Sequence, residues 1–216
     1  MLSFTDNLIL VIDLILNKLP ESLRYKVRNA LLKRDDFSII SDNCWGGFVY
    51  QHFQLRYKTP FVGLFIFSPD YMKLIENVKH YMEVELVFIE PKLSKYREQL
   101  DLSSGVYPIA RLNDVEIHFL HYKDELEAEY KWVKRKQRIN YDNLIIKMND
   151  RDLFDADMLP MFEKVPARKV FLSSRYVNHN FAFKLYGEKE GCIQNEWTNF
   201  RKTISPISLM NNLMKR

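Results

Sequence analysis

Small polar and ionisable residues follow four apolar segments of the sequence. Parallel α/β sheets bind their ligands beyond the carboxyl ends of the strands, so we expect these residues to converge on one cleft. The alternative is that each group is only a turn or a helix cap. The four groups are Asp42 with Asn43 and Cys44, Ser68 with Asp70, Asn149 with Asp150, and Ser173 with Ser174 and Arg175.

The stretch from Asp42 to Gly47 is the most unusual local feature. The paired Gly46 and Gly47 would let backbone N–H groups approach a phosphate, although neither a dinucleotide fingerprint nor a P-loop is present. Cys44 acts as a nucleophile only beside a base, and otherwise it is a small buried hydrophobe. Trp45 either stacks on a sugar or base, or fills the core.

Acidic and histidine side chains alternate along the segment 114–121. Asp114, Glu116 and His118 share one face of a predicted strand, and His121 lies on the other. Glu116 and His118 are close enough for acid–base chemistry. The alternatives are an exposed sheet face with ordinary charges and a metal site with carboxylate and histidine ligands.

A basic stripe runs along the predicted helix 124–138. Its members Lys131, Lys134, Arg135 and Arg138 recur at helical spacing, which suits a diphosphate, an anionic glycan or an RNA backbone, or else a solvated surface. Polar residues continue just after this helix and suit a ligand that is rich in hydroxyl groups. They are Asn140, Asn143, Lys147 and Asn149.

The elements that would position these residues alternate between strands and helices, which indicates βαβ units. We therefore expect an α/β fold with a mostly parallel sheet, flanking helices, a β-hairpin insertion and an N-terminal helical pair. Expected strands are 37–41, 61–67, 84–89, 144–148 and 169–173, with a hairpin over 108–122. Expected helices are 5–18, 21–33, 48–53, 68–81, 124–138 and 155–164, and 42–47 is expected to be a loop.

Length and composition indicate a globular chain. The 216 residues are 47% hydrophobic and 28% charged, with a net charge of +4 and two cysteines. This excludes a disordered chain and a zinc ribbon, and the mild charge argues against a nucleic-acid partner. We divide the chain into an N-terminal helical pair (1–35), an α/β core (36–180) and a C-terminal tail (181–216) that packs on the core or is partly mobile.

The N-terminal region allows two interpretations. The apolar segment 8–16 is too short to span a bilayer, which takes about 20 residues, and it reads as a buried helix. Alternatively, residues 1–34 make a weak membrane-surface contact, because Arg24, Lys26, Arg28, Lys33 and Arg34 make the second helix basic.

Four stretches of sequence carry a resemblance when taken together. They are 37–47, 59–65 with 69–71, 114–122, and 132–136 with 138–140, 142–143 and 147–150. In this combination, residues 36–175 resemble a bacterial family of unknown function whose members are often labelled exopolysaccharide biosynthesis proteins. Asp42 departs from the family pattern, which has Asn before the Asn-Cys-Trp-Gly-Gly word. The resemblance implies a role in making a surface glycan on the cytoplasmic side, and it assigns no catalytic residue.

These features lead to one hypothesis and one alternative. We expect a cytoplasmic transferase that acts on a nucleotide-activated sugar or a glycan acceptor. The interpretation in which residues 1–34 contact a membrane would place it peripherally at the inner face of that membrane. The alternative is a non-catalytic glycan-binding or assembly protein of a polysaccharide locus. Glu116, His118 or Asp150 would act as the base. Asp150 with Asp152, or Asp155 with Asp157, has the Asp-x-Asp spacing of metal-dependent glycosyltransferases, although the sequence identifies no cofactor.

The remaining expected roles concern substrate binding. Gly46 and Gly47 would bind phosphate, and Lys134, Arg135 and Arg138 would offset its charge. The other expected substrate-binding residues are Asn43, Cys44, Trp45, Asp70, Asn140, Asn143, Lys147 and Asn149. The hypothesis requires the loops that carry Asn43, Gly46, Asp70 and Asp150 to meet at a single rim, with His118 and Arg135 within reach.

Overall fold

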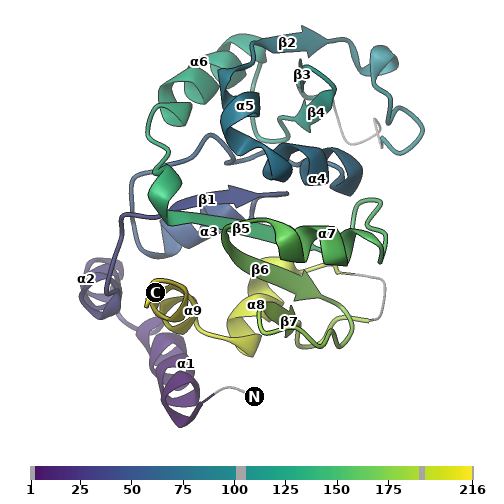
Figure 1. Ribbon diagram of the computed structural model, residues 1–216. Coiled ribbons are helices and arrows are strands. Elements are labelled where there is room, and N and C mark those ends of the chain that lie inside the picture. The colour runs from purple at the N-terminus through teal and green to yellow at the C-terminus, as the bar shows by residue number, and fades with distance from the viewer. Residues whose placement is uncertain (1–2, 101–105, 190–192, 216) are drawn as a thin grey trace.

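A parallel four-stranded sheet lies at the centre of the computed structural model, which describes residues 3–100, 106–189 and 193–215 (Figure 1). Its strands lie side by side in the order β1 (Ser38–Ser41), β5 (Leu144–Asn149), β6 (Arg168–Ser173) and β7 (Ala182–Lys184), and every neighbouring pair is parallel. The predicted α/β fold with a mostly parallel sheet is therefore confirmed.

A small antiparallel sheet stands beside the parallel one. It consists of β2 (Leu86–Ile89), β3 (Ile109–Leu112) and β4 (Val115–His118) in that order. β3 and β4 form the predicted hairpin, which turns through Asn113 in the left-handed region at φ 56°. The predicted strand 84–89 was expected in the parallel sheet, but β2 pairs antiparallel with β3.

Helices cover the sheets and extend from them (Figure 1). They are α1 (Phe4–Leu16), α2 (Glu21–Leu31), α3 (Trp45–His52), α4 (Ser68–Glu76), α5 (Val78–Glu83), α6 (Glu125–Lys136), α7 (Met158–Lys164), α8 (Glu196–Thr203) and α9 (Pro206–Leu213).

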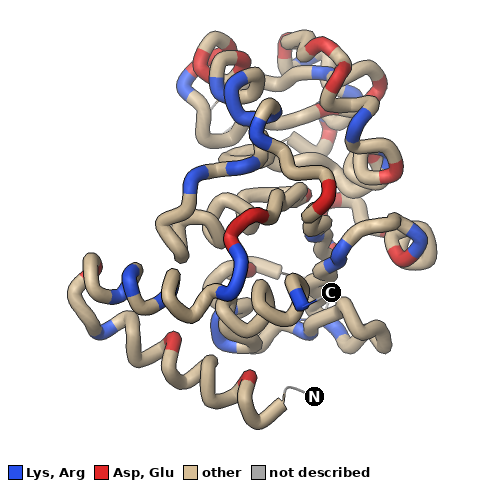
Figure 2. The backbone as a smooth tube through the Cα atoms, turned by 60° about the vertical axis from the view of Figure 1, so that its left-hand side comes forward, with Lys and Arg blue, Asp and Glu red and all other residues tan. Residues whose placement is uncertain are grey.

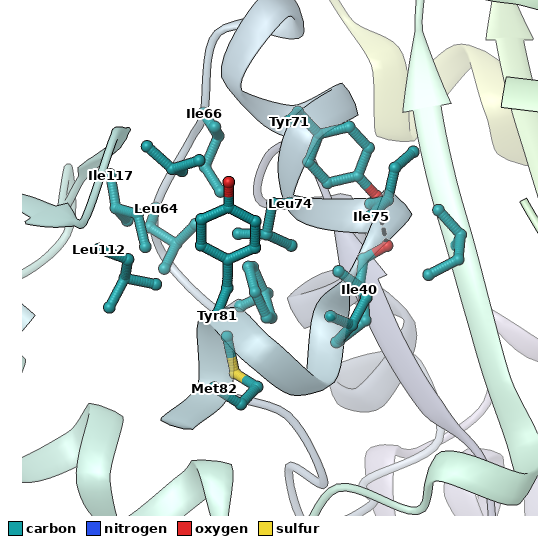
Figure 3. Close-up of a cluster of buried hydrophobic side chains, with 14 of the residues drawn as sticks. Ile40, Leu64, Ile66, Tyr71, Leu74, Ile75, Tyr81, Met82, Leu112 and Ile117 are labelled. Carbon is teal, nitrogen blue, oxygen red and sulfur yellow. Dashed lines mark hydrogen bonds between the residues drawn. The ribbon is translucent and has the colours of Figure 1, made fainter. Parts of the chain in front are cut away.

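The pleat of the parallel sheet separates two hydrophobic cores, because successive side chains of a strand point to opposite faces. Ile40 and Ile146 belong to the core that contains α4, α5 and the antiparallel sheet (Figure 3). Ile39 and Ile145 belong to the core that contains α3, α8 and α9. Lys147 follows Ile145 by two residues, so the pleat places it on the face that α8 covers.

Tyr71 fixes α4 against the parallel sheet. Its hydroxyl is buried and lies 2.7 Å from the carbonyl oxygen of Ile40 (Figure 3). The same hydroxyl lies 2.8 Å from the carbonyl oxygen of Lys147. These two carbonyls belong to the adjacent strands β1 and β5, so one side chain holds both strands beneath the helix.

The predicted strand 61–67 is wrong. The segment is buried but forms only an isolated bridge, between Phe65 and His118 of β4. Gly63 takes a left-handed conformation at φ 72°, which interrupts an extended path. Ile66 N–H donates to the Asp42 carbonyl at 2.8 Å. The segment is therefore a connection between the two sheets, and its apolar character reflects burial rather than strand pairing.

Two further local predictions are corrected. The predicted helix 68–81 is two helices, α4 and α5, separated at Asn77, whose side chain accepts a hydrogen bond from His80 N–H at the start of α5. The predicted loop 42–47 is helical from Trp45 onward, so both Gly46 and Gly47 belong to α3.

The two ends of the described chain pack on each other. α1 lies against α9, and only Asp13 and Leu16 of α1 are buried. The expectation that 8–16 forms a buried helix is therefore wrong for most of its length. None of the described helices combines the length and apolar character needed to cross a bilayer.

Candidate functional site

A lysine is buried at the carboxyl end of β5. Lys147 is fully buried, and its Nζ donates to Asp42 Oδ1 at 2.8 Å. The same Nζ lies 3.1 Å from Asn43 Oδ1 and forms an ion pair with Glu196. One cation therefore faces two carboxylates away from bulk water, an arrangement that proteins tolerate only where the charges are paired.

Two amides complete this network. Asn149 Nδ2 donates to Glu196 Oε2 at 2.8 Å, and Asn43 Nδ2 donates to the same oxygen at 2.6 Å. Asp42 Oδ2 accepts from the backbone N–H of Asn149 at 2.9 Å. The side chains of Asp42, Asn43, Lys147, Asn149 and Glu196 thus form one hydrogen-bonded group, which we call the lysine network.

Strand register explains how these residues meet. The parallel pairing of β1 with β5 sets Ser41 opposite Lys147, so the residues that follow these two lie side by side. Glu196 comes from the first turn of α8, which packs on that face of the sheet. The lysine network is therefore assembled from three segments that are distant in the sequence.

The charges of the lysine network favour a titration near neutrality. Burial raises the pKa of Asp42 to about 7, with a further increase from the negative charge of Glu196. Burial opposes the charge on Lys147, but the two carboxylates outweigh it and raise the pKa of this lysine. The ammonium therefore stays charged, and the excess negative charge is relieved by proton uptake at Asp42.

A pocket of about 510 Å³ opens beside the lysine network, beyond the carboxyl ends of β1 and β5. We call it the tryptophan pocket. Asn43 and Glu196 line it, so part of the lysine network reaches the pocket wall. The other lining residues are Cys44, Trp45, Phe48, Phe65, Leu120, Arg151, Asp152, Gln194, Asn195, Trp197 and Thr198.

Aromatic rings form much of this wall. Trp197 is half-buried and packs on Phe48, with ring centroids 5.7 Å apart, and edge-on against Trp45 at 6.4 Å. Amides and hydroxyls from Gln194, Asn195 and Thr198 lie on the same pocket. A wall of this composition, with apolar faces and a few directed polar groups, is typical of small-molecule sites.

The loop that follows β5 is strained where it meets the pocket. Asp152 and Leu153 are both in the left-handed region, at φ 51° and 68°. A leucine in this region costs about 1–2 kcal/mol, and such strain gathers at functional sites. Ser68 holds the loop, because its N–H donates to the Asp152 carbonyl and its hydroxyl to the Arg151 carbonyl, each at 2.9 Å. Burial raises the pKa of Asp152.

A second pocket of about 350 Å³ adjoins the first and shares Cys44 and Phe48 with it. We call it the arginine pocket. Arg135 lines it, donates to the Tyr122 hydroxyl at 2.8 Å and lies over the Tyr57 ring. No carboxylate of the described chain forms an ion pair with this guanidinium. Gln51, Gly47, Val62, Gly63, His121 and Lys131 complete the lining.

The structure brings several of the predicted site residues to these pockets. Asn43, Cys44 and Trp45 line the tryptophan pocket, and Lys147 and Asn149 lie in the network beside it. Gly47 and Arg135 line the arginine pocket.

Gly46 serves packing rather than the expected phosphate site, and Cys44 fits the interpretation in which it is not a nucleophile. A Cβ on Gly46 would lie 2.9 Å from Ile39 Cγ2, so this glycine serves the close packing of α3 on β1. Burial raises the pKa of the Cys44 thiol to about 11, which keeps it protonated and a poor nucleophile.

Glu116 of β4 and Asp70 of α4 form a separate buried group beside the antiparallel sheet. Glu116 accepts from Ser94 Oγ at 2.6 Å and from Arg111 Nη2 at 2.9 Å. Asp70 accepts from the backbone N–H of Glu116 and from Lys95 Nζ, each at 2.7 Å. The alternative of an exposed sheet face is therefore wrong. Neither acid lines the two pockets, and the expected single rim through Asp70 does not form.

His118 is enclosed by aromatic rings. It is fully buried, and its ring stacks on Phe65 with centroids 4.5 Å apart. Neither ring nitrogen has a hydrogen-bond partner among the described residues. Burial lowers the pKa of His118 to about 4, so the imidazole is neutral at neutral pH. Its ring stacks on Phe65, which lines the tryptophan pocket, and no acid of the described residues is hydrogen-bonded to it.

Asp150 ties β5 to β6. Its carboxylate accepts from the hydroxyls of Ser173 and Ser174 at 2.8 and 2.9 Å, and from the Ser174 N–H. Asp152 instead lines the tryptophan pocket, so the two acids of the Asp-x-Asp spacing have different surroundings. Among the described residues, no three His, Cys, Asp or Glu side chains form a group that could hold a metal ion.

The remaining predicted residues lie outside both pockets. Lys134 is exposed and donates to the Tyr130 hydroxyl, and Arg138 donates to the Tyr57 carbonyl at 3.3 Å. Asn140 and Asn143 bond Asp36 at the amino end of β5. That end is about 20 Å from the pocket side, at about 3.3 Å per residue of strand.

Sequence reasoning missed the residues that α8 supplies. Glu196 and Trp197 lie in the tail, where no periodic pattern drew attention to them. The usable signal was Lys147 itself, since a lysine inside an apolar strand requires buried acidic partners.

Comparison with known proteins defines the family. A family model described as a domain of unknown function, DUF1919, matches residues 15–215. The chain belongs to the DUF1919 family. The expectation of a family of unknown function is therefore confirmed. The DUF1919 match covers both pockets and the whole lysine network, and it begins near the end of α1.

One similar protein comes from Haemophilus influenzae (strain ATCC 51907 / DSM 11121 / KW20 / Rd). It is described as an uncharacterized protein and is 30% identical over 179 residues, covering 75% of this chain and 81% of that protein. Its description assigns no activity, so the site of this DUF1919 member has to be interpreted from its own geometry.

Proposed function

We propose that this protein is a transferase that binds an activated sugar across the two pockets and passes it to a glycan acceptor in exopolysaccharide or capsule synthesis. The biosynthetic setting and a cytoplasmic location come from the motif resemblance. The observation that carries the chemistry is Glu196, an acid on the wall of an aromatic pocket and fixed by the buried Lys147.

The tryptophan pocket suits a sugar. The half-buried ring of Trp197 offers an apolar face, and Asn43, Gln194 and Asn195 offer amides that can hydrogen-bond hydroxyl groups. A hydroxyl-rich ligand needs both, because its ring faces are apolar while its edges must replace the hydrogen bonds that water made.

Glu196 is the proposed base. Lys147 and the amides of Asn43 and Asn149 hold its carboxylate in one orientation, so that it can take the proton of an acceptor hydroxyl in the pocket. Asp42, whose pKa burial raises to about 7, can bind the excess proton of the lysine network at neutral pH. This assignment moves the base from Glu116, His118 or Asp150 to a residue on the pocket wall.

The arginine pocket is the proposed phosphate subsite. Arg135 presents N–H donors beyond the one that Tyr122 accepts, and Lys131, which is paired with Glu127, lies on the same lining. Guanidinium groups bind phosphate through paired, charge-assisted hydrogen bonds. Because Cys44 and Phe48 line both pockets, a ligand with a sugar on one side and a diphosphate on the other can occupy them together.

A panel of nucleotide sugars tests the proposal through binding and turnover. The variant Glu196→Gln should bind the active nucleotide sugar within about threefold of the wild type but lose about 10²–10⁴-fold in turnover. Arg135→Gln should weaken nucleotide binding by about tenfold or more. The exposed Glu98→Gln serves as the matched acid control and should change neither. Full turnover by Glu196→Gln, or no binding across the panel, contradicts the proposal.

A non-catalytic glycan-binding protein is the second candidate. The hydrogen bonds of Glu196 favour it. The amides of Asn43 and Asn149 and the ammonium of Lys147 already bind this carboxylate, which leaves it less free to accept a proton from an acceptor hydroxyl. In that case Trp197→Ala should abolish glycan binding, Glu196→Gln should leave it unchanged, and no nucleotide sugar should be consumed.

A further inference from the structure

Helix α1 has an inverted polarity. Phe4, Leu8, Val11 and Ile15 are 85%, 50%, 53% and 54% exposed. Their spacing of four, three and four residues places them on one stripe of the helix, on the side that faces away from the protein. A helix on the surface of a soluble domain normally turns its polar side outward, so this stripe is an exposed apolar surface that needs a partner.

The acids of α1 point the other way. Asp13 is buried, forms an ion pair with Arg28 at 2.9 Å and accepts from Ser205 Oγ at 3.1 Å. Asp6 accepts from Asn212 Nδ2 at 3.1 Å. These are the two charged residues of the helix, and both tie it to α2 or α9. The outer stripe is therefore apolar without interruption by a charge, and the helix is firmly held in this orientation.

Positive charge flanks the stripe. Figure 2 shows the Lys and Arg positions of the adjacent α2, whereas α1 has acidic positions alone. The exposed charged residues of the segment 17–34 are Lys18, Lys26, Lys33 and Arg34, with the single acid Glu21. Arg34 is paired with Asp36 at 2.7 Å, so the three lysines are the cations available to a partner. Exposed Leu23 and Leu31 extend the apolar surface onto α2.

We propose that α1 lies flat on an anionic lipid bilayer, with its outer stripe among the acyl chains and the exposed cations of the segment 17–34 at the headgroups. Helix α1 has 13 residues, which at about 1.5 Å each give about 20 Å, short of the roughly 30 Å hydrocarbon core. It therefore suits the interface rather than a span. The flanking cations favour anionic lipid over a second copy of this chain, which would carry the same charges. The docking does not depend on the proposed function.

Vesicle flotation of the full chain tests this docking. We expect flotation with vesicles of phosphatidylcholine mixed with phosphatidylglycerol, and little with phosphatidylcholine alone. The triple variant Leu8→Gln, Val11→Gln and Ile15→Gln should reduce the partition coefficient by at least about tenfold. Its control is Leu126→Gln, Tyr130→Gln and Val133→Gln, three exposed apolar residues of α6, which should float like the wild type.

The charge contribution is measured separately. Lys26→Gln with Lys33→Gln should weaken binding to the anionic vesicles by about fivefold for each lysine removed. Added salt should also weaken the binding of the wild type, because it screens the attraction between the lysines and the anionic lipid. Circular dichroism and sedimentation velocity on every variant show that the fold is intact and report the oligomeric state.

Three results overturn the proposal. Absence of flotation by the wild type on anionic vesicles is the first, and equal loss by the α6 control is the second. The third is a dimer that dissociates in the α1 variant while no protein floats, which would identify a second copy of this chain as the partner of the stripe.

Discussion

Replacing Lys147 by methionine should strongly destabilise the protein at neutral and higher pH. The variant keeps most of the side-chain volume but leaves the carboxylates of Asp42 and Glu196 without their cation. Removing one partner of a buried ion pair costs about 3–5 kcal/mol, whereas an exposed pair is worth under about 1 kcal/mol. In urea, at about 1–3 kcal/mol per molar, the unfolding midpoint should fall by at least about 1 M.

The pH dependence of this loss is the sharper test. The pKa of Asp42 is raised to about 7 in the folded wild type, so the folded state binds more protons than the unfolded chain between about pH 4 and that value. This contribution to stability is complete below about pH 4 and is lost as the pH rises through about 7. Without the lysine the Asp42 carboxylate binds a proton more readily, and the deficit of Lys147→Met should be smaller at about pH 5 than at about pH 8.

A compensating variant serves as the control. Adding Asp42→Asn and Glu196→Gln to Lys147→Met removes the unpaired charges, and at least about half of the lost stability should return. Urea unfolding followed by tryptophan fluorescence measures all three proteins. A loss below about 1 kcal/mol, or one that is equal at about pH 5 and about pH 8, would refute the description of Lys147 as a buried, paired ammonium.

The remaining predictions concern packing, a buried imidazole and a buried thiol. Gly46→Ala should lower the free energy of unfolding by about 1–3 kcal/mol in urea titrations, because its Cβ would lie 2.9 Å from Ile39 Cγ2; an unchanged midpoint would contradict the close contact. The wild type should lose stability as the pH falls from about 6.5 to about 4, because the unfolded imidazole of His118 binds a proton that the folded state excludes. His118→Phe should remove this loss, which approaches about 3 kcal/mol over that interval. Identical acid unfolding profiles of the two proteins would contradict the prediction. In a Cys192→Ser background, Cys44 should react with iodoacetamide at about pH 8 about a hundredfold more slowly than the same chain in urea, because burial raises its pKa to about 11; equal rates would show an accessible thiolate.

The parallel sheet could be predicted because its strands carry a sufficient local signal. β1, β5 and β6 are short apolar runs buried on both faces, and such runs followed by helices indicate a parallel sheet. The segment 61–67 has a similar apolar composition, but the strand predicted for it is wrong. It is buried between the two sheets and forms only an isolated bridge instead of a continuous ladder of hydrogen bonds. Composition reports burial, and only the partner strand decides whether a buried segment is a strand.

The candidate site could be predicted only where its residues lie at the carboxyl end of a strand. Asp42 and Asn43 follow β1 and Asn149 ends β5, so parallel pairing brings them together. Glu196 lies 47 residues beyond Asn149, and no local pattern relates the two. Glu116 and His118 were expected at the site because their types suit acid–base chemistry. Glu116 is buried by the segment 94–96, and His118 is buried by Phe65. Both contacts are long-range packing, which cannot be predicted from the alternation of side chains along a strand.

The origin of Glu196 in α8 has a consequence for how the protein is made. A ribosome releases the chain from its amino end, so Lys147 and Asp42 emerge well before the acid that completes their network. Until α8 docks, the nascent domain holds the ion pair of Lys147 with Asp42, which has no net charge, and its pocket lacks the proposed base. A polypeptide interrupted before this helix would be inert whatever fold the earlier part had reached, so the proposed activity would arise only once the last helices are in place.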